Sequence, residues 1–239
     1  MKKTIAVVIT ITALAVPTLF ATPLNLVGGY GPWQTGTGGE FTFQSPGVSG
    51  IIANYYSGAK NQDTTVAEQP NFQTFCVEGG EYINSSVQYY NANMSDGSLQ
   101  SGIHVTYGAA LLYSMFASGT LAAATPGYDY ANTTSRTSDA ALLQIALWHY
   151  MGGQDGYVAY DPNNKYEAYA NSVLGALDNT STGVSGVDGV YVLNMYDLSG
   201  ANAQDMLIWT TPDGGTTVML LGIGLMGLVL ASRRFSIAR

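Results

Sequence analysis

Cys76 is the only cysteine among 239 residues, and it is the side chain with the widest range of possible chemistry. A thiol can form a disulfide, attack an electrophile as a thiolate, or lie buried as a small apolar group. No disulfide can form within the chain, because a second cysteine is missing. The chain ends, described below, predict export. An odd cysteine in an exported protein indicates an intermolecular disulfide, a buried inert thiol or a reactive role.

Other side chains offer little support for catalysis or metal binding. His104 and His149 are the only histidines, and no ligand spacing accompanies them. We therefore predict no metal site and no cofactor. A hydrolase that pairs Cys76 with His149 is the least favoured function class, because no family signature surrounds either residue. We expect the protein not to be an enzyme.

The segment around Cys76 and a helical segment about seventy residues later together resemble a known family. The first reads FCV and the second reads LQIALW. This pair resembles the thioester domains of bacterial surface adhesins, where a cysteine sulfur is bonded to a glutamine side-chain carbon with loss of ammonia. The resemblance extends roughly over residues 40–209 and implies a thioester between Cys76 and Gln144. The neighbouring motif positions are Phe75, Val77, Leu143, Leu147 and Trp148.

A thioester is an activated acyl group, which gives the resemblance a functional meaning. An amine or hydroxyl on another surface attacks it, so that an amide or ester forms and the Cys76 thiol is released. A folded domain supplies the proximity and orientation that such a weak reaction needs. The resemblance thus implies a one-time covalent attachment to a protein or polysaccharide. The alternative is a non-covalent structural or binding protein of the extracellular matrix or biofilm, in which Cys76 is inert and Gln144 lies beside Trp148 on one helix face.

The N-terminus predicts a cleavable signal peptide over residues 1–21. Lys2 and Lys3 precede an apolar run, residues 5–16, which is followed by Pro17 and a cleavage point after Ala21. The run is too short to span the ~30 Å hydrocarbon core of a membrane comfortably.

The C-terminus predicts a membrane helix over residues 216–232, an uncharged segment followed by Arg233 and Arg234. Basic residues on that side place the C-terminus in the cytoplasm. Just before the helix stands the turn-forming sequence TPDGG, with Pro212, Asp213, Gly214 and Gly215. The three parts resemble the PEP-CTERM sorting signal in its VPDGG variant, although Thr211 stands in place of Val. The alternative is an ordinary tail anchor.

This second resemblance implies a Gram-negative bacterium and an exosortase-type enzyme that removes the tail at the sorting motif, residues 211–215. The protein would be anchored in the inner membrane during transit and then pass to the cell surface or exopolysaccharide matrix. Similar thioester domains occur in exported PEP-CTERM proteins, so the two resemblances support each other.

The charge of the central region excludes one class of partner. Between residues 22 and 211 the basic residues are Lys60, Arg136 and Lys165, against fifteen of the sixteen acidic residues in the chain, which leaves out Asp213. The formal charge of this region is therefore −12, and nucleic-acid binding is not expected.

The order of strand-like and helix-like segments predicts an α+β fold. Short β-prone segments occupy 38–43, 48–56, 73–77, 189–194 and 205–209. Helical spacing predicts helices at 105–118, at 140–151 with Ser138 or Asp139 as the cap, and from Asp161-Pro162 to Leu177. We expect one extracellular domain over 22–210. It would consist of a sandwich or barrel-like β-rich subdomain with a helical insertion at about 97–178.

Overall fold

A computed structural model describes residues 22–26, 33–35, 38–44, 71–84, 89–124, 127–131, 134–152, 159–179 and 189–210. The signal peptide, the predicted strand at 48–56, and the sorting motif with its membrane helix and Arg233-Arg234 lie outside these residues. Among the residues described, no helix has the length and apolar character that crossing a membrane requires.

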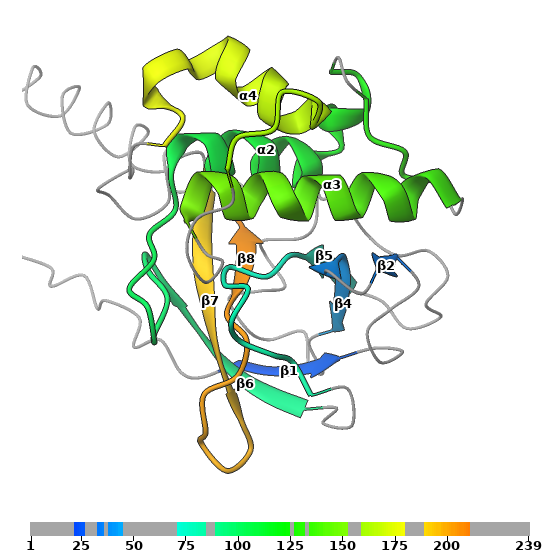
Figure 1. Ribbon diagram of the computed structural model, residues 1–239. Helices are drawn as coiled ribbons and strands as arrows, with labels where there is room; N and C mark the ends of the chain where they lie inside the picture. The colour runs from blue at the N-terminus through cyan, green and yellow to red at the C-terminus, as the bar shows by residue number, and fades with distance from the viewer. Residues whose placement is uncertain are drawn as a thin grey trace, which may run out of the picture.

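Six strands form one antiparallel sheet, in the order β5-β4-β1-β6-β7-β8. They are β1 (Thr22–Leu26), β4 (Phe41–Gln44), β5 (Asn71–Thr74), β6 (Tyr89–Ser95), β7 (Val190–Asp197) and β8 (Met206–Trp209). The sheet curls until its two ends meet (Figure 1), because the chain just beyond β5 is hydrogen-bonded to β8. β2 (Gln34–Thr35) and β3 (Gly38–Gly39) form a separate two-stranded sheet.

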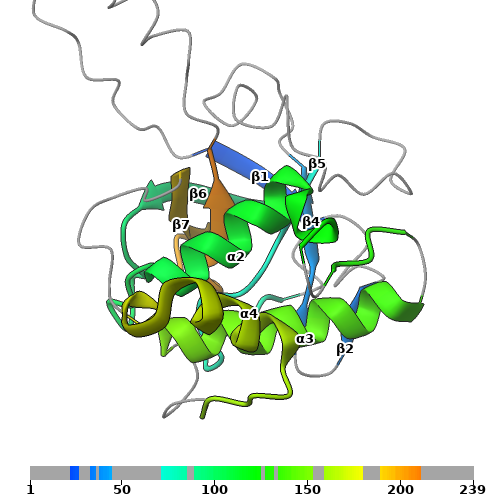
Figure 2. The same ribbon diagram turned by 90° about the horizontal axis from the view of Figure 1, so that it is seen from above.

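The helices lie between β6 and β7 in the chain and gather at one end of the curled sheet (Figures 1 and 2). They are α2 (Tyr107–Ser118), α3 (Thr134–Met151) and α4 (Lys165–Leu174), with the short helices η1 (Thr120–Ala122) and η2 (Gly175–Leu177). Thr106 caps the start of α2 by accepting a hydrogen bond from the Ala109 N–H. Gly119 ends the helix with a left-handed φ of 75°. The predicted mixture of sheet and inserted helices is confirmed.

Two predicted helix starts are wrong. α3 begins at Thr134, and Asp139 lies within the helix, where its carboxylate accepts a hydrogen bond from the Asp129 N–H. α4 is capped by Asn164, which accepts from the Tyr166 N–H, whereas Asp161 forms a local turn with Asn163. In both cases several capping residues stand close together, and tertiary contacts select among them.

The strand predictions missed β1 and β6 and misplaced two other boundaries. β1 carries a proline, and β6 reads YYNANMS, whose asparagines are depleted in strands. The segment predicted at 38–43 is divided between β3 and β4, with Glu40 between them. β5 ends at Thr74, and Cys76 forms only an isolated bridge with Met206.

The apolar side chains form two cores that meet at residues 75–77. One core packs the helices against the sheet and contains Phe75 and Val77. The other fills the curled sheet and contains Cys76. Phe75 anchors the junction, because its ring packs edge-to-face on Phe116 of α2 with 5.0 Å between centroids. Successive residues of one extended segment thus point into different cores.

Candidate functional site

The backbone of Cys76 faces the helices because its neighbours are bonded to β8. The Phe75 carbonyl accepts from the Leu207 N–H at 3.0 Å, and the Val77 N–H donates to the Asp205 carbonyl at 2.9 Å. In an antiparallel pair, the backbone groups of the residue between two such bonds point away from the partner strand. The N–H and C=O of Cys76 therefore need a partner from another element.

Gln144, on α3, is that partner. Its Oε1 accepts from the Cys76 N–H at 3.0 Å, and its Nε2 donates to the Cys76 carbonyl at 2.9 Å. Both residues are buried, with exposed fractions of 5% for Cys76 and 0% for Gln144. The glutamine amide thus continues the sheet by one step, in the way that a neighbouring strand would. The structure brings together the two residues that the sequence singled out, 68 positions apart.

The motif neighbours divide between the two cores around this pair. Leu143 and Leu147 pack with Phe75 and Val77 in the helix-side core, whereas Trp148 joins Cys76 in the core of the sheet. α3 therefore inserts its Gln144 side between two apolar layers. This arrangement keeps bulk water away from the Cys76–Gln144 pair.

Gly38, in β3, packs on Gln144. The sequence did not predict this role for Gly38. Its φ is +105°, a value that L side chains rarely adopt. A Cβ at this position would lie 2.9 Å from Gln144 Cγ and 3.3 Å from Cη2 of the Trp148 ring. Its only signal in the sequence is the Gly-Gly pair at 38–39, which lies within the segment predicted as a strand.

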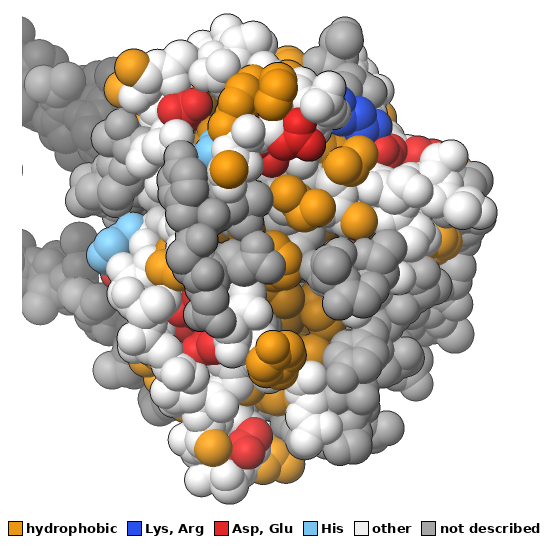
Figure 3. Space-filling model, viewed as in Figure 1, with side chains coloured by type: hydrophobic (Ala, Val, Ile, Leu, Met, Phe, Trp, Pro, Cys, Tyr) orange, Lys and Arg blue, Asp and Glu red, His pale blue; other side chains and the backbone are white. Residues whose placement is uncertain are grey.

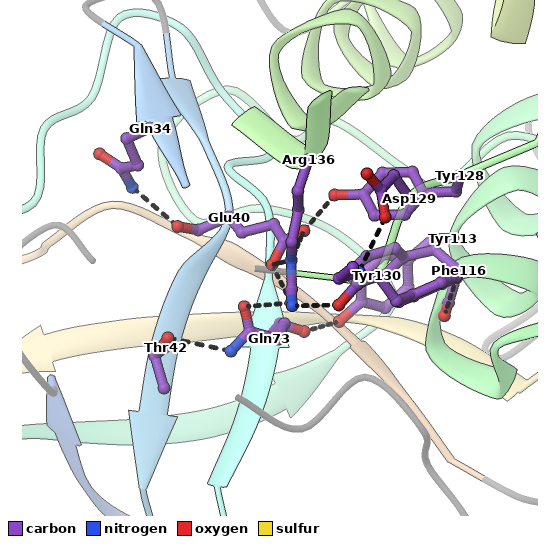
Figure 4. Close-up of polar contacts among 11 residues, drawn as sticks. Gln34, Glu40, Thr42, Gln73, Tyr113, Phe116, Tyr128, Asp129, Tyr130 and Arg136 are labelled. Carbon is purple, nitrogen blue, oxygen red and sulfur yellow. Dashed lines mark hydrogen bonds and ion pairs between the residues drawn. The ribbon is translucent and has the colours of Figure 1, made fainter. Parts of the chain in front are cut away.

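A buried ion pair between Arg136 and Glu40 fixes α3 on the sheet (Figure 4). The Arg136 Nη2–Glu40 Oε2 distance is 2.7 Å, and Arg136 Nε also donates to both carboxylate oxygens. The Tyr128 hydroxyl donates to the same carboxylate, and the guanidinium lies 4.7 Å from the Trp33 ring centroid. Gln144 follows Arg136 by eight residues, about 12 Å along the helix. The ion pair and the Gln144 amide are therefore two separate anchors for α3.

Burial also determines the protonation of the Cys76 thiol. Desolvation raises the pKa of Cys76 well above its usual range, and the nearby carboxylates of Glu81 and Glu78 raise it further. The thiol is therefore protonated at neutral pH. A reaction at Sγ has to dispose of this proton.

The two histidines lie in different surroundings. His104 is exposed, and its Nδ1 is 3.1 Å from the Asp96 carbonyl oxygen. His149 is buried against the rings of Tyr150 and Tyr160. It follows Gln144 by five residues, which turns it by about 140° around the helix. The side of α3 that carries His149 thus differs from the side that meets Cys76.

Comparison with known proteins identifies the C-terminal segment. Residues 212–235 match the VPDSG-CTERM motif. This match supports a PEP-CTERM-like sorting signal, and hence an exported, envelope-associated protein. No curated protein and no solved structure matches the chain.

Proposed function

We propose that this exported protein attaches covalently to an amine- or hydroxyl-bearing surface component through a thioester between Cys76 Sγ and the Gln144 side-chain carbon. The observation that carries the proposal is the pair of hydrogen bonds, 2.9 and 3.0 Å long, between the Gln144 amide and the Cys76 backbone. They hold the carboxamide against the one residue that carries a thiol. Proximity of this kind lowers the barrier of a slow intramolecular reaction.

The proposed bond formation balances without an external reactant. The Cys76 sulfur attacks the Gln144 carbonyl carbon, and the carbon–nitrogen bond of the carboxamide breaks. The thiol proton passes to the departing –NH2 group, which leaves as ammonia. The protonated state of the thiol is therefore compatible with the net reaction, since that proton is required in the product.

The Cys76 N–H has a second use in this step. It donates to Gln144 Oε1, the oxygen on which negative charge develops as sulfur attacks. A backbone N–H already aimed at this oxygen stabilises the tetrahedral intermediate without reorganisation. Burial of both residues then slows hydrolysis of the thioester.

Transfer to the target completes the proposed function. A lysine amine or sugar hydroxyl attacks the acyl carbon, the carbon–sulfur bond breaks, and the nucleophile's proton ends on the Cys76 sulfur. Because Gly38 packs on Gln144, this step requires displacement of the β2–β3 segment. The protein is consumed as a cross-link and does not turn over. On the face drawn in Figure 3 charged side chains are few and mostly acidic, and hydrophobic side chains gather near its centre.

Intact mass spectrometry of the purified full-length chain tests the bond. We expect a mass one ammonia below that of the full sequence, with uptake of methylamine at Gln144 and release of one titratable thiol. Cys76→Ala and Gln144→Ala should each abolish the deficit. Gln204→Ala is a matched control, since Gln204 is also buried and also donates to backbone carbonyls, those of Glu78 and Asp205. A full-mass wild-type protein with a free thiol would refute the proposal.

The two alanine variants should differ in stability, which provides an internal check. Cys76→Ala keeps the hydrogen bonds, because they use the Cys76 backbone. Gln144→Ala leaves a buried N–H and a buried C=O without partners, at about 1–3 kcal/mol each. The loss of the mass deficit in Cys76→Ala therefore cannot be attributed to unfolding.

Processing at the C-terminus is the second part of the proposal. An exosortase-type enzyme would cut at the motif within residues 212–235 and release the protein from its membrane helix to the surface or matrix. Terminal sequencing of protein from its own host tests this. Recovery of intact Arg239 from surface material would contradict it.

A non-covalent matrix protein is the second candidate. It is supported by the same contact, since the Gln144 amide satisfies two buried backbone groups and so has a structural use. In that case the thiol remains a small buried group of high pKa. A full mass combined with no methylamine uptake would establish this candidate over the first.

A further inference from the structure

Three carboxylates converge where the curled sheet closes. Glu78 and Glu81 follow the Cys76 segment, and Asp205 immediately precedes β8. Each of the three contributes an oxygen atom that lies within 4.8 Å of the other two. The closure of the sheet creates the cluster, because it joins residues more than 120 positions apart.

Two of the oxygens are buried without a hydrogen-bond donor. Glu78 is 4% exposed; its Oε1 accepts from the Ser101 hydroxyl, but its Oε2 has no partner. Glu81 Oε1 is likewise buried and unpartnered, while its Oε2 accepts from the Asp205 N–H at 3.2 Å. A buried carboxylate oxygen without a donor carries a substantial desolvation cost. Such an oxygen indicates that a positively charged or hydrogen-bonding group belongs beside it.

The basic side chains of the described residues are engaged elsewhere. Arg136 is paired with Glu40, and Lys165 is paired with Asp139. Asp205 itself is held in place by backbone groups, since it accepts from the Leu99 N–H at 2.8 Å and from the Met195 N–H at 3.1 Å. The cluster is thus acidic, firmly positioned and supplied with oxygen ligands.

We propose that Glu78, Glu81 and Asp205 bind one calcium ion at the closure of the sheet. Calcium takes six to eight oxygen ligands at about 2.3–2.6 Å, so oxygens on opposite sides of one ion lie about 4.6–5.2 Å apart. Three carboxylate oxygens that lie within 4.8 Å of one another are close enough to share one such ion. Magnesium demands shorter, near-octahedral contacts and gives up water reluctantly, so it should bind more weakly. Sites in extracellular modules work at about 10⁻⁴–10⁻³ M calcium, which suits an exported protein.

A bound ion would stabilise the chain segments around the Cys76–Gln144 pair. Glu78 lies two residues from Cys76, and the backbone carbonyl of Asp205 accepts a hydrogen bond from the Val77 N–H. The ion would therefore hold together the two chain segments whose pairing orients the Cys76 backbone toward Gln144. This inference concerns the closure of the sheet and does not depend on the thioester.

The alternative occupant is a proton shared by Glu78 and Glu81. Burial, and then the contact with Glu78, raises the pKa of Glu81 to about 8. Burial opposes ionisation of Glu78 too, yet hydrogen bonds involving Glu81, Ser101 and Ser98 leave the pKa of Glu78 lowered. A proton held in this way would satisfy both buried oxygens without a metal.

Calcium titration of the purified full-length chain, after removal of metals with a chelator, distinguishes the two occupants. We expect saturable binding of one Ca²⁺ per chain by calorimetry. At a calcium concentration about twenty times the dissociation constant, the thermal midpoint should rise by about 4–7 °C. Calcium alone is the probe, and magnesium at the same concentration is the comparison. No saturable binding at millimolar calcium would overturn the proposal.

Glu81→Gln keeps the test decisive, because it should fold. Its amide oxygen can still accept from the Asp205 N–H, and its –NH2 group can donate to the unpartnered Glu78 Oε2. We expect this variant to be at least as stable as wild type in chelator and to lose the calcium response. Asp96→Asn, which removes an exposed carboxylate outside the cluster, should keep it. Undiminished calcium binding by Glu81→Gln would refute the site, whatever the state of the thioester.

Discussion

Replacing Arg136 by methionine removes the cation from a carboxylate that has no contact with water. The side chains of Arg136 and Glu40 are 3% and 0% exposed, and their closest nitrogen–oxygen distance is 2.7 Å. In the variant, the Glu40 carboxylate keeps the hydrogen bond from the Tyr128 hydroxyl (Figure 4) but loses the cation. Breaking a buried pair by removing one partner costs about 3–5 kcal/mol, because the remaining charge is left uncompensated. We expect a loss of this size in the free energy of unfolding.

Urea unfolding of the full-length chain measures this loss, with Lys165→Met as the matched control. Lys165 also pairs with a carboxylate, that of Asp139, but its side chain is 31% exposed. A partly exposed pair contributes about 0–1 kcal/mol. The midpoint should therefore fall far more for Arg136→Met, with little change in the dependence on urea. The double variant Arg136→Met/Glu40→Gln should recover part of the loss. Equal losses for Arg136→Met and Lys165→Met would refute the reasoning.

Two further predictions concern Gly38, which packs on Gln144, and the pH dependence of stability that Glu167 causes. Gly38→Ala should destabilise the fold by about 1–3 kcal/mol and reduce the ammonia mass deficit, because the new Cβ would lie 2.9 Å from Gln144 Cγ at a φ of +105°. Gly102→Ala is its control, since Gly102 also has a positive φ but has no atom within 4 Å of the added Cβ; equal deficits in the two variants would contradict the first prediction. Burial raises the pKa of Glu167 above its ordinary 4.5, so the folded state holds this proton more tightly than the unfolded state. Stability from this group is complete below pH 4.5 and is lost as the pH rises through the folded pKa. Glu167→Gln should flatten that decline in pH-dependent unfolding curves, and an unchanged decline would contradict the prediction.

The sequence allowed prediction of the elements with strong local signals. α2 has helical spacing and a glycine stop at Gly119, so the predicted range of 105–118 lies within two residues of its limits. β7 and β8 are rich in β-branched and aromatic residues and were located correctly, although β7 extends three residues beyond the predicted end at 194. Cys76 and Gln144 were paired through a family resemblance, because neither residue alone indicates a partner 68 positions away.

The remaining features depend on contacts between distant parts of the chain. Glu40 and Arg136 are separated by 96 positions, and each alone reads as an ordinary surface charge. Glu78, Glu81 and Asp205 form a cluster only because the sheet closes, and no metal-ligand spacing marks them in the sequence. Gly38 acquires its meaning from the α3 side chains packed against it. Local propensity contains no information about such contacts.

The position of β8 determines how the fold would respond to mechanical tension. β8 is hydrogen-bonded along one edge to β7 and along the other to residues 75–77, and the Thr210 N–H still bonds to the Gly189 carbonyl at 2.7 Å. The sorting-motif match begins two residues later, at Pro212. A pull from an anchored C-terminus would therefore reach β8 with almost no slack and would load both of its edges together. The strand that such a pull would load first is therefore one that hydrogen bonds secure from two sides.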